Sequence, residues 1–172
     1  MGLFTNTNYA DLESMLKLNV AVPTEMTHLF GKKMAPRKRG GIILMSSVLA
    51  FQGTPHFATY AATKSYLLTL GEALNVELRP KGIDVLTLLP GLTDTPMTRS
   101  MGIDWSKMPV CLQSSRTVAR IGLRHIGRKS IVVTGFLNSI YAWQTRFLPR
   151  AWVVKLYDLL FSRAINSFQR FL

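Results

Sequence analysis

Apolar residues recur at helical spacing through several segments of the chain. The first predicted helix spans residues 11–36, with Asp11 as its expected N-cap. A second is expected over residues 57–78, a short basic one over 115–127, and a terminal one over 152–172. These helices alternate with shorter apolar segments.

Those shorter segments have the pattern of strands. Residues 42–45 form an unbroken apolar run, which is typical of a strand buried on both faces of a parallel sheet. Two further strands are expected at 83–89 and 131–134, whereas residues 92–114 predict a long loop with room for one helical turn. Alternating helices and strands predict the α/β class, with three parallel strands and flanking helices.

The composition of the 172 residues, 48% hydrophobic and 17% charged, is that of a globular protein. We expect one domain over residues 1–150 and a basic amphipathic helix over 151–172. The single cysteine, Cys111, excludes an intramolecular disulfide, and no residues have metal-ligand spacing, so no metal site is predicted. A cytoplasmic location is expected, since the sequence also lacks a signal-peptide pattern and a membrane-spanning run.

The net charge of +12 is concentrated in the last third of the chain. Residues 105–172 hold eleven Lys and Arg against one acid, Asp158. Such a surface attracts anionic partners, yet no zinc-finger, RRM or basic-zipper pattern is present, so no nucleic-acid partner is predicted. The terminal helix could lie on an anionic membrane surface, or it could pack back on the domain or on a partner subunit. Both alternatives stay open.

One pair of side chains has the spacing of an acid–base site. Tyr60 and Lys64 are four residues apart and so share one helix face, where the cation would lower the pKa of the phenol. Ser47 closes the strand-like run thirteen residues before Tyr60. It is expected at the carboxyl edge of the sheet, where open α/β sheets bind ligands. Alone, a Tyr-x-x-x-Lys pattern is common on ordinary helices.

Four motifs in order give the pair its context. They are Leu-Asn-Val at 18–20, the strand ending in Ser-Ser at 42–47, Tyr-Ala-Ala-Thr-Lys at 60–64, and Leu-Pro-Gly-Leu-Thr-Asp-Thr-Pro at 89–96. Together they resemble the short-chain dehydrogenase/reductase family over roughly residues 3–135. The resemblance implies a Rossmann-type fold and, more specifically, the ketone, long-chain acyl or steroid reductases.

The resemblance also implies roles for four side chains. Tyr60 would be the general acid in reduction and the base in oxidation. Lys64 would lower the pKa of Tyr60 and bind the nicotinamide ribose, while Ser47 would hold the substrate oxygen. Asn19 would tie Lys64 to a proton-relay water.

The implied cofactor is NADP or NAD, and the implied reaction is hydride transfer with a carbonyl or alcohol. Expected cofactor contacts are Tyr60, Lys64, Pro90, Gly91, Thr93 and Thr95, where Thr93 replaces the family's usual valine or isoleucine. The loop at 97–114 would cover the substrate. Its Met97, Met101, Ile103 and Trp105 suggest a small apolar substrate, although such residues also simply anchor loops.

One family feature is missing from the sequence. None of the twelve glycines forms the glycine-rich turn that binds the cofactor pyrophosphate. By resemblance the chain lacks the first βα units, about 90 residues, which would leave the strand at 42–46 with an unpaired edge. The alternative hypothesis is therefore a catalytically silent remnant that acts as an interaction or membrane-surface module. A homo-oligomer is also expected, since the family often forms dimer contacts through the first two helices found here.

Overall fold

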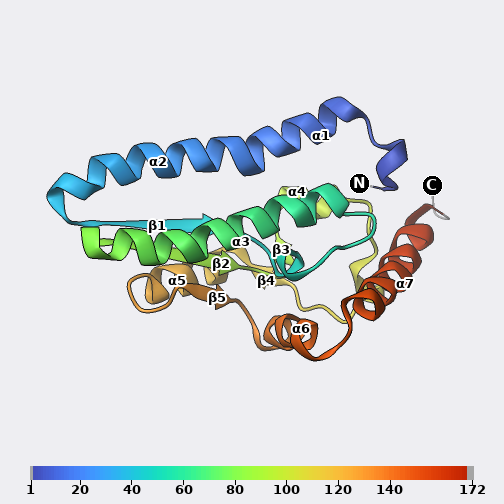
Figure 1. Ribbon diagram of the computed structural model, residues 1–172. Coiled ribbons are helices and arrows are strands. Elements are labelled where there is room, and N and C mark those ends of the chain that lie inside the picture. The colour runs from blue at the N-terminus through green and yellow to red at the C-terminus, as the bar shows by residue number, and fades with distance from the viewer. Residues whose placement is uncertain (1, 170–172) are drawn as a thin grey trace.

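A parallel three-stranded sheet is the centre of the computed structural model, which describes residues 2–169 (Figure 1). The strands are β1 (Gly40–Met45), β2 (Ile83–Leu89) and β5 (Ile131–Val133), in the order β1-β2-β5. Both pairings are parallel. The predicted α/β class, the partial parallel sheet and its three strands are thus confirmed.

A long interrupted helix precedes the sheet. It consists of α1 (Tyr9–Leu16), a π-helical turn (Lys17–Ala21) and α2 (Val22–Met34), which together form the rod at the top of Figure 1. The predicted helix is confirmed, but its predicted cap is wrong. The Asn8 side chain accepts a hydrogen bond from the Ala10 amide, so the helix begins before Asp11.

The other helices flank the sheet or follow it. They are α3 (Ala58–Leu78), α4 (Pro96–Arg99), α5 (Ser115–His125), α6 (Phe136–Phe147) and α7 (Arg150–Gln169). A Cβ on Gly71 of α3 would lie 1.9 Å from the Thr87 hydroxyl, and one on Gly122 of α5 would lie 2.9 Å from Leu88. Thr87 and Leu88 are neighbours on β2, so their side chains point to opposite faces of the sheet. Helices α3 and α5 therefore cover opposite faces of β2.

Strand β1 is an edge strand in the described part of the chain. It pairs with β2 alone, and a groove of about 510 Å³ runs between it and α2. Leu44 is buried, but Ile42 and Ile43 are only half-buried and Met45 is exposed. The prediction of burial on both faces is therefore wrong for β1, because none of residues 2–169 forms a strand on its outer side. The predicted unpaired edge is confirmed.

Residues 92–114 are more ordered than the predicted loop. Strands β3 (Thr93–Asp94) and β4 (Gln113–Ser114) pair in parallel and close the loop at its base. Helix α4 and a 3₁₀ turn at Trp105–Lys107 lie between them. Two-residue strands leave no periodic pattern, which explains why the sequence did not predict them.

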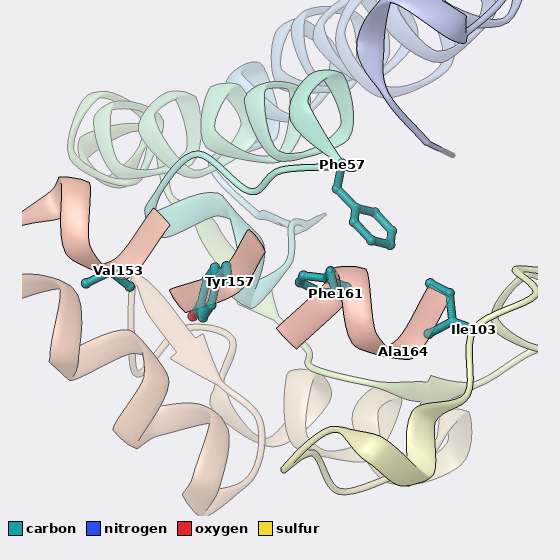
Figure 2. Close-up of a cluster of buried hydrophobic side chains, with 6 residues drawn as sticks. All are labelled: Phe57, Ile103, Val153, Tyr157, Phe161 and Ala164. Atoms are coloured by element: carbon teal, nitrogen blue, oxygen red, sulfur yellow. The ribbon is translucent and has the colours of Figure 1, made fainter. Parts of the chain in front are cut away.

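The terminal helix packs on the domain. Val153, Tyr157, Phe161 and Ala164 of α7 form a buried cluster with two residues of other segments, Phe57 and Ile103 (Figure 2). The rings of Phe57 and Phe161 lie 4.8 Å apart. Packing is thus the observed role of this face of α7.

The helical spacing of 152–172 predicts an apolar face made of Val153, Leu156, Leu160, Ala164, Phe168 and Phe171, and the observed face differs from it. Val153 and Ala164 are buried as predicted, whereas Leu156 is exposed. Phe168 and Phe171 fall outside the described side chains, and the last three residues of the predicted helix fall outside the described residues. The boundary between residues 150 and 151 stays a prediction. Across residues 2–169, none of the helices has both the length and the apolar character needed to cross a bilayer.

Burial of Tyr157 makes the stability of the fold decrease at alkaline pH. Burial raises the pKa of Tyr157 to about 12 from its ordinary 10.0, although the Gln144 amide donates a hydrogen bond to its hydroxyl at 3.1 Å. Because the folded pKa is the higher one, the neutral phenol contributes fully to stability below pH 10. That contribution is lost as the pH rises towards 12, and it amounts to about 2 to 3 kcal/mol.

Urea unfolding of the wild type and of Tyr157→Phe between pH 8 and pH 12 measures this contribution. The free energy of unfolding of the wild type should fall more steeply above pH 10 than that of Tyr157→Phe. Tyr9→Phe is the matched control, since Tyr9 is exposed and should leave the fall unchanged. Equal slopes for the wild type and Tyr157→Phe would show that Tyr157 is not responsible.

Candidate active site

A cavity of about 380 Å³ opens at the carboxyl ends of β1 and β2. Ligands of open α/β sheets bind at this edge, and the volume lies within the range of small-molecule pockets. The cavity walls are largely apolar. The few polar side chains that reach it include Ser47, Tyr60, Lys64, Thr93, Thr95 and Asn138.

Ser47 and Tyr60 meet where β1 ends and α3 begins. Ser47 follows β1 and caps a 3₁₀ turn, since its hydroxyl accepts a hydrogen bond from the Leu49 amide at 3.2 Å. The amide of the next residue, Val48, donates to the Pro90 carbonyl at 3.0 Å, which ties this turn to the end of β2. The Ser47 and Tyr60 side chains both line the cavity, and Ser47 lies close enough to lower the pKa of the Tyr60 phenol. The juxtaposition expected from the sequence is therefore present.

Lys64 lies one helical turn after Tyr60. Its Nζ lies 5.5 Å from the centre of the Tyr60 ring and donates to the Met45 carbonyl at 3.0 Å. The Ser46 hydroxyl donates to the Lys64 carbonyl at 2.7 Å, which fixes this turn of α3 against β1. Burial lowers the pKa of Lys64. One ammonium N–H is bonded to the protein, so two others are available to a ligand.

The pKa of Tyr60 shifts in the direction opposite to the sequence-based expectation. Burial raises the pKa of Tyr60, and the nearby Ser47 hydroxyl opposes this shift only in part. The Lys64 ammonium is directed to the Met45 carbonyl and faces the ring of Tyr60. The phenol is therefore protonated at neutral pH, as a proton donor must be.

Asn19 lies in the π-helical turn between α1 and α2. Its amide nitrogen donates to the Thr63 hydroxyl at 3.2 Å, and that hydroxyl donates to the Tyr60 carbonyl at 2.8 Å. Asn19 is thus bonded to the residue before Lys64. Both Asn19 and Lys64 line the groove between β1 and α2. π-Helical turns occur frequently at functional sites, so the irregularity is consistent with a role for Asn19.

The segment after β2 forms one wall of the cavity. Pro90, Gly91, Thr93 and Thr95 all line it. The Thr93 hydroxyl donates to the Gly91 carbonyl at 3.1 Å, and the Thr95 hydroxyl caps α4 by accepting from the Thr98 amide at 3.2 Å. Four of the six predicted cofactor contacts are therefore gathered on one wall of the cavity that Tyr60 and Ser47 also line.

The loop after this wall covers the cavity with apolar side chains. Met97, Met101 and Trp105 line it, as expected for a substrate cover. Ile103 instead joins the buried cluster with α7.

The sequence did not single out Asn138. This side chain of α6 is buried and donates to the Thr134 carbonyl at 2.5 Å. It also packs on Gly91, where a Cβ would lie 2.3 Å from the Asn138 amide atoms. An amide among large apolar and aromatic residues was the available signal, but its contact with Gly91 depends on the tertiary fold.

Comparison with known proteins places these features in a family. The family model described as short chain dehydrogenase matches residues 1–104. Hydroxysteroid dehydrogenase-like protein 1 of Gallus gallus is 36% identical over 164 residues, covering 95% of this chain and 49% of the relative. The Homo sapiens protein named inactive hydroxysteroid dehydrogenase-like protein 1 is 35% identical over 95 residues, covering 55% and 29%.

Solved structures share the fold. A structure described for its insights into 7beta-hydroxysteroid dehydrogenase stereoselectivity has a TM-score of 0.78 at 20% identity, covering 91% of this chain and 62% of the other. A short-chain dehydrogenase from Sphingobium yanoikuyae in complex with NADPH has a TM-score of 0.68 at 25% identity, covering 85% and 58%. The chain spans between 28% and 53% of the length of the first curated relatives that it matches.

Proposed function

The chain belongs to the short-chain dehydrogenase family, and we propose that it acts as an oxidoreductase on a carbonyl or alcohol with NADP or NAD. One observation carries the proposal. Tyr60 lies beside Ser47 and one helical turn from Lys64, and all three side chains line one cavity on the carboxyl edge of the sheet. The three side chains provide a proton donor, a partner for the substrate oxygen and a cation.

The residues present fit the nicotinamide half of the cofactor. Lys64 has two N–H groups available for a ribose, and Pro90, Gly91 and Thr93 offer a wall next to it. The bound cofactor would supply a hydride at C4 of its ring. The NADPH complex of the similar Sphingobium protein supports this choice. No glycine-rich turn is available among the 172 residues for the pyrophosphate.

The protein's own task is to move a proton. The bound cofactor would supply the hydride and its two electrons to the carbonyl carbon. As the C=O π bond breaks, the carbonyl oxygen would take the proton of the Tyr60 hydroxyl. Ser47 holds the substrate oxygen, and the Lys64 ammonium favours the phenolate left on Tyr60. In alcohol oxidation the phenolate takes the proton back.

The cavity favours an apolar substrate. Met97, Met101 and Trp105 cover it from the loop, and Tyr157 and Leu160 of α7 close another side. Ser47 and Lys64 lie beside Tyr60, where a single carbonyl or hydroxyl would bind. Ketosteroids and long-chain ketones combine such an apolar body with one polar group, and the names of the relatives support steroids as the first compounds to test.

Cofactor binding tests the proposal without a known substrate. We expect NADPH or NADH to bind the 172-residue chain, with a rise in nicotinamide fluorescence that oxidised cofactor reverses by competition. Lys64→Met should weaken binding about tenfold through loss of the charged hydrogen bonds, whereas Lys17→Met, at an exposed position, should not. If neither cofactor binds a folded chain, the proposal is wrong for this chain.

A second candidate is a catalytically silent interaction module. The edge of β1 has no partner strand among residues 2–169, and one human relative carries the name inactive. A folded chain that binds neither cofactor would favour this candidate.

Self-association through α1–α2 and α3 is also proposed. Leu29 and Phe30, which are exposed on α2, support it. The light-scattering mass of the chain in solution tests it, and a strictly monomeric mass would exclude it.

A further inference from the structure

Helices α6 and α7 each expose a stripe of large apolar side chains. The outer stripes, as we call them, are Phe136, Ile140, Trp143 and Phe147 on α6 and Trp152, Leu156 and Leu159 on α7. The spacings of four, three and four residues on α6, and of four and three on α7, place each set on one helix face. Phe136 is 81% exposed, Phe147 73% and Trp152 69%.

The opposite faces of these helices are already occupied. Asn138 and Tyr141 of α6 and Tyr157 and Phe161 of α7 line the cavity. A surface helix ordinarily turns polar residues outward once its apolar face is buried. Because both helices are apolar on two sides, the outer stripes form an exposed apolar patch of the kind that marks an interaction site.

The charges near the patch distinguish between two possible occupants, a second copy of the chain and an anionic lipid surface. Arg150, Lys155 and Arg163 are exposed on α7, and Arg163 continues the α7 stripe by one turn. The only acid in residues 105–172 is Asp158, whose carboxylate lies 3.3 Å from His56 Nε2. A second copy would bring these cations face to face, whereas anionic headgroups complement them.

The tryptophan residues of the patch also favour a lipid surface. Trp143 and Trp152 both lie in the outer stripes. Indole rings are enriched at membrane–water interfaces, where one side of the ring meets lipid and the other meets water. Basic residues beside an apolar helix face are typical of helices that lie in the plane of such an interface.

We propose that the outer stripes of α6 and α7 dock on the surface of an anionic lipid bilayer. The two helices would lie in the interface, with their apolar side chains among the acyl chains and their cations at the headgroups. Because the inner faces of the same helices line the cavity, docking would bring the cavity wall next to the lipid. This inference goes beyond the proposed redox function and does not depend on it.

Vesicle sedimentation tests the proposal with the 172-residue chain. We expect the chain to sediment with phosphatidylcholine vesicles that contain about one-third phosphatidylserine, and less with pure phosphatidylcholine. Salt should weaken the binding without abolishing it, because the apolar contribution is not screened. Absence of sedimentation with the anionic vesicles would overturn the proposal.

Paired variants separate the outer stripes from general hydrophobicity. Phe147→Ser with Trp152→Ser should lower the partition coefficient at least about tenfold. The control is Val76→Ser with Leu123→Ser, whose side chains are 72% and 70% exposed on α3 and α5, and it should bind as the wild type does. Equal losses in the two double variants would contradict docking through α6 and α7. Circular dichroism checks that each variant is folded.

A second pair of variants separates local charge from total charge. Arg150→Glu with Lys155→Glu should weaken vesicle binding more than Lys32→Glu with Lys33→Glu, which changes the net charge equally on α2. Light scattering identifies the competing occupant. If the outer-stripe variant lowers the oligomer mass and leaves vesicle binding unchanged, the patch binds a second copy and the proposal is wrong. Loss of cofactor binding alone would contradict only the redox function.

Discussion

Tyr60→Phe should lower the rate of NADPH-dependent ketone reduction by about 10²- to 10⁴-fold, which is the usual contribution of a general acid. The substitution removes only the hydroxyl that lies near Ser47. The ring of Tyr60 stays available for its edge contact with Phe57, so the fold and the cofactor affinity should change little. The measurement is NADPH consumption under saturating cofactor with a steroid or long-chain ketone.

Tyr66→Phe is the matched control for this prediction. Tyr66 lies on the same helix, and its hydroxyl is 2.8 Å from the Thr24 hydroxyl of α2, outside the residues that line the cavity. We expect the activity of Tyr66→Phe to stay within about twofold of the wild type, since a lost exposed hydrogen bond has a small effect. Comparable losses in both variants, or full activity in Tyr60→Phe, would remove Tyr60 from the reaction.

Phe161→Ala should lower the free energy of unfolding by about 3 to 5 kcal/mol. Phe161 is buried in the cluster that joins α7 to the rest of the chain, and its ring contacts those of Phe57 and Tyr157 (Figure 2). Truncation leaves a cavity that the surrounding aromatic side chains cannot fill. Urea unfolding measures the change.

Phe147→Ala makes the same chemical change on the outside of the neighbouring helix. Because Phe147 is exposed, its replacement should change the free energy of unfolding by no more than about 0.5 kcal/mol. Phe161→Leu should lower the free energy of unfolding by an intermediate amount. This variant keeps the prediction testable if Phe161→Ala does not fold. If Phe161→Ala is no more harmful than Phe147→Ala, α7 does not contribute to the core.

Periodicity predicted the elements that are long and regularly patterned. Strand β2 is central and buried at every position except Asp84, so its largely apolar run matched its surroundings. Strand β1 has a similar run but lies at an edge, and burial of a strand depends on neighbours that a local pattern does not report. Strands β3 and β4 are two residues long, too short for any period.

Helix α6 was not predicted from the sequence. Its apolar residues reach both the cavity and the outside of the molecule. The outward-facing residues are those of the outer stripe that we propose as a docking surface.

The candidate site was predictable where it depends on local geometry. Tyr60 and Lys64 share a helix face by their spacing, and Ser47 reaches them because it ends the preceding strand. The hydrogen bond from Asn19 to Thr63 and the packing of Asn138 on Gly91 depend on tertiary contacts. The raised pKa of Tyr60 has the same origin, since burial is the larger effect and no spacing in the sequence reports it.

Transfer of an isotope label tests the central claim most directly. The folded wild-type chain is incubated with NADPH or NADH deuterated at C4 of the nicotinamide and with a panel of steroid and long-chain ketones, and the products are analysed by mass spectrometry. We predict an alcohol that carries deuterium on the former carbonyl carbon, formed by the wild type and by Tyr66→Phe and lost in Tyr60→Phe. Absence of labelled alcohol from the wild type with both cofactors, or equal labelling by Tyr60→Phe, would contradict the assignment of this site.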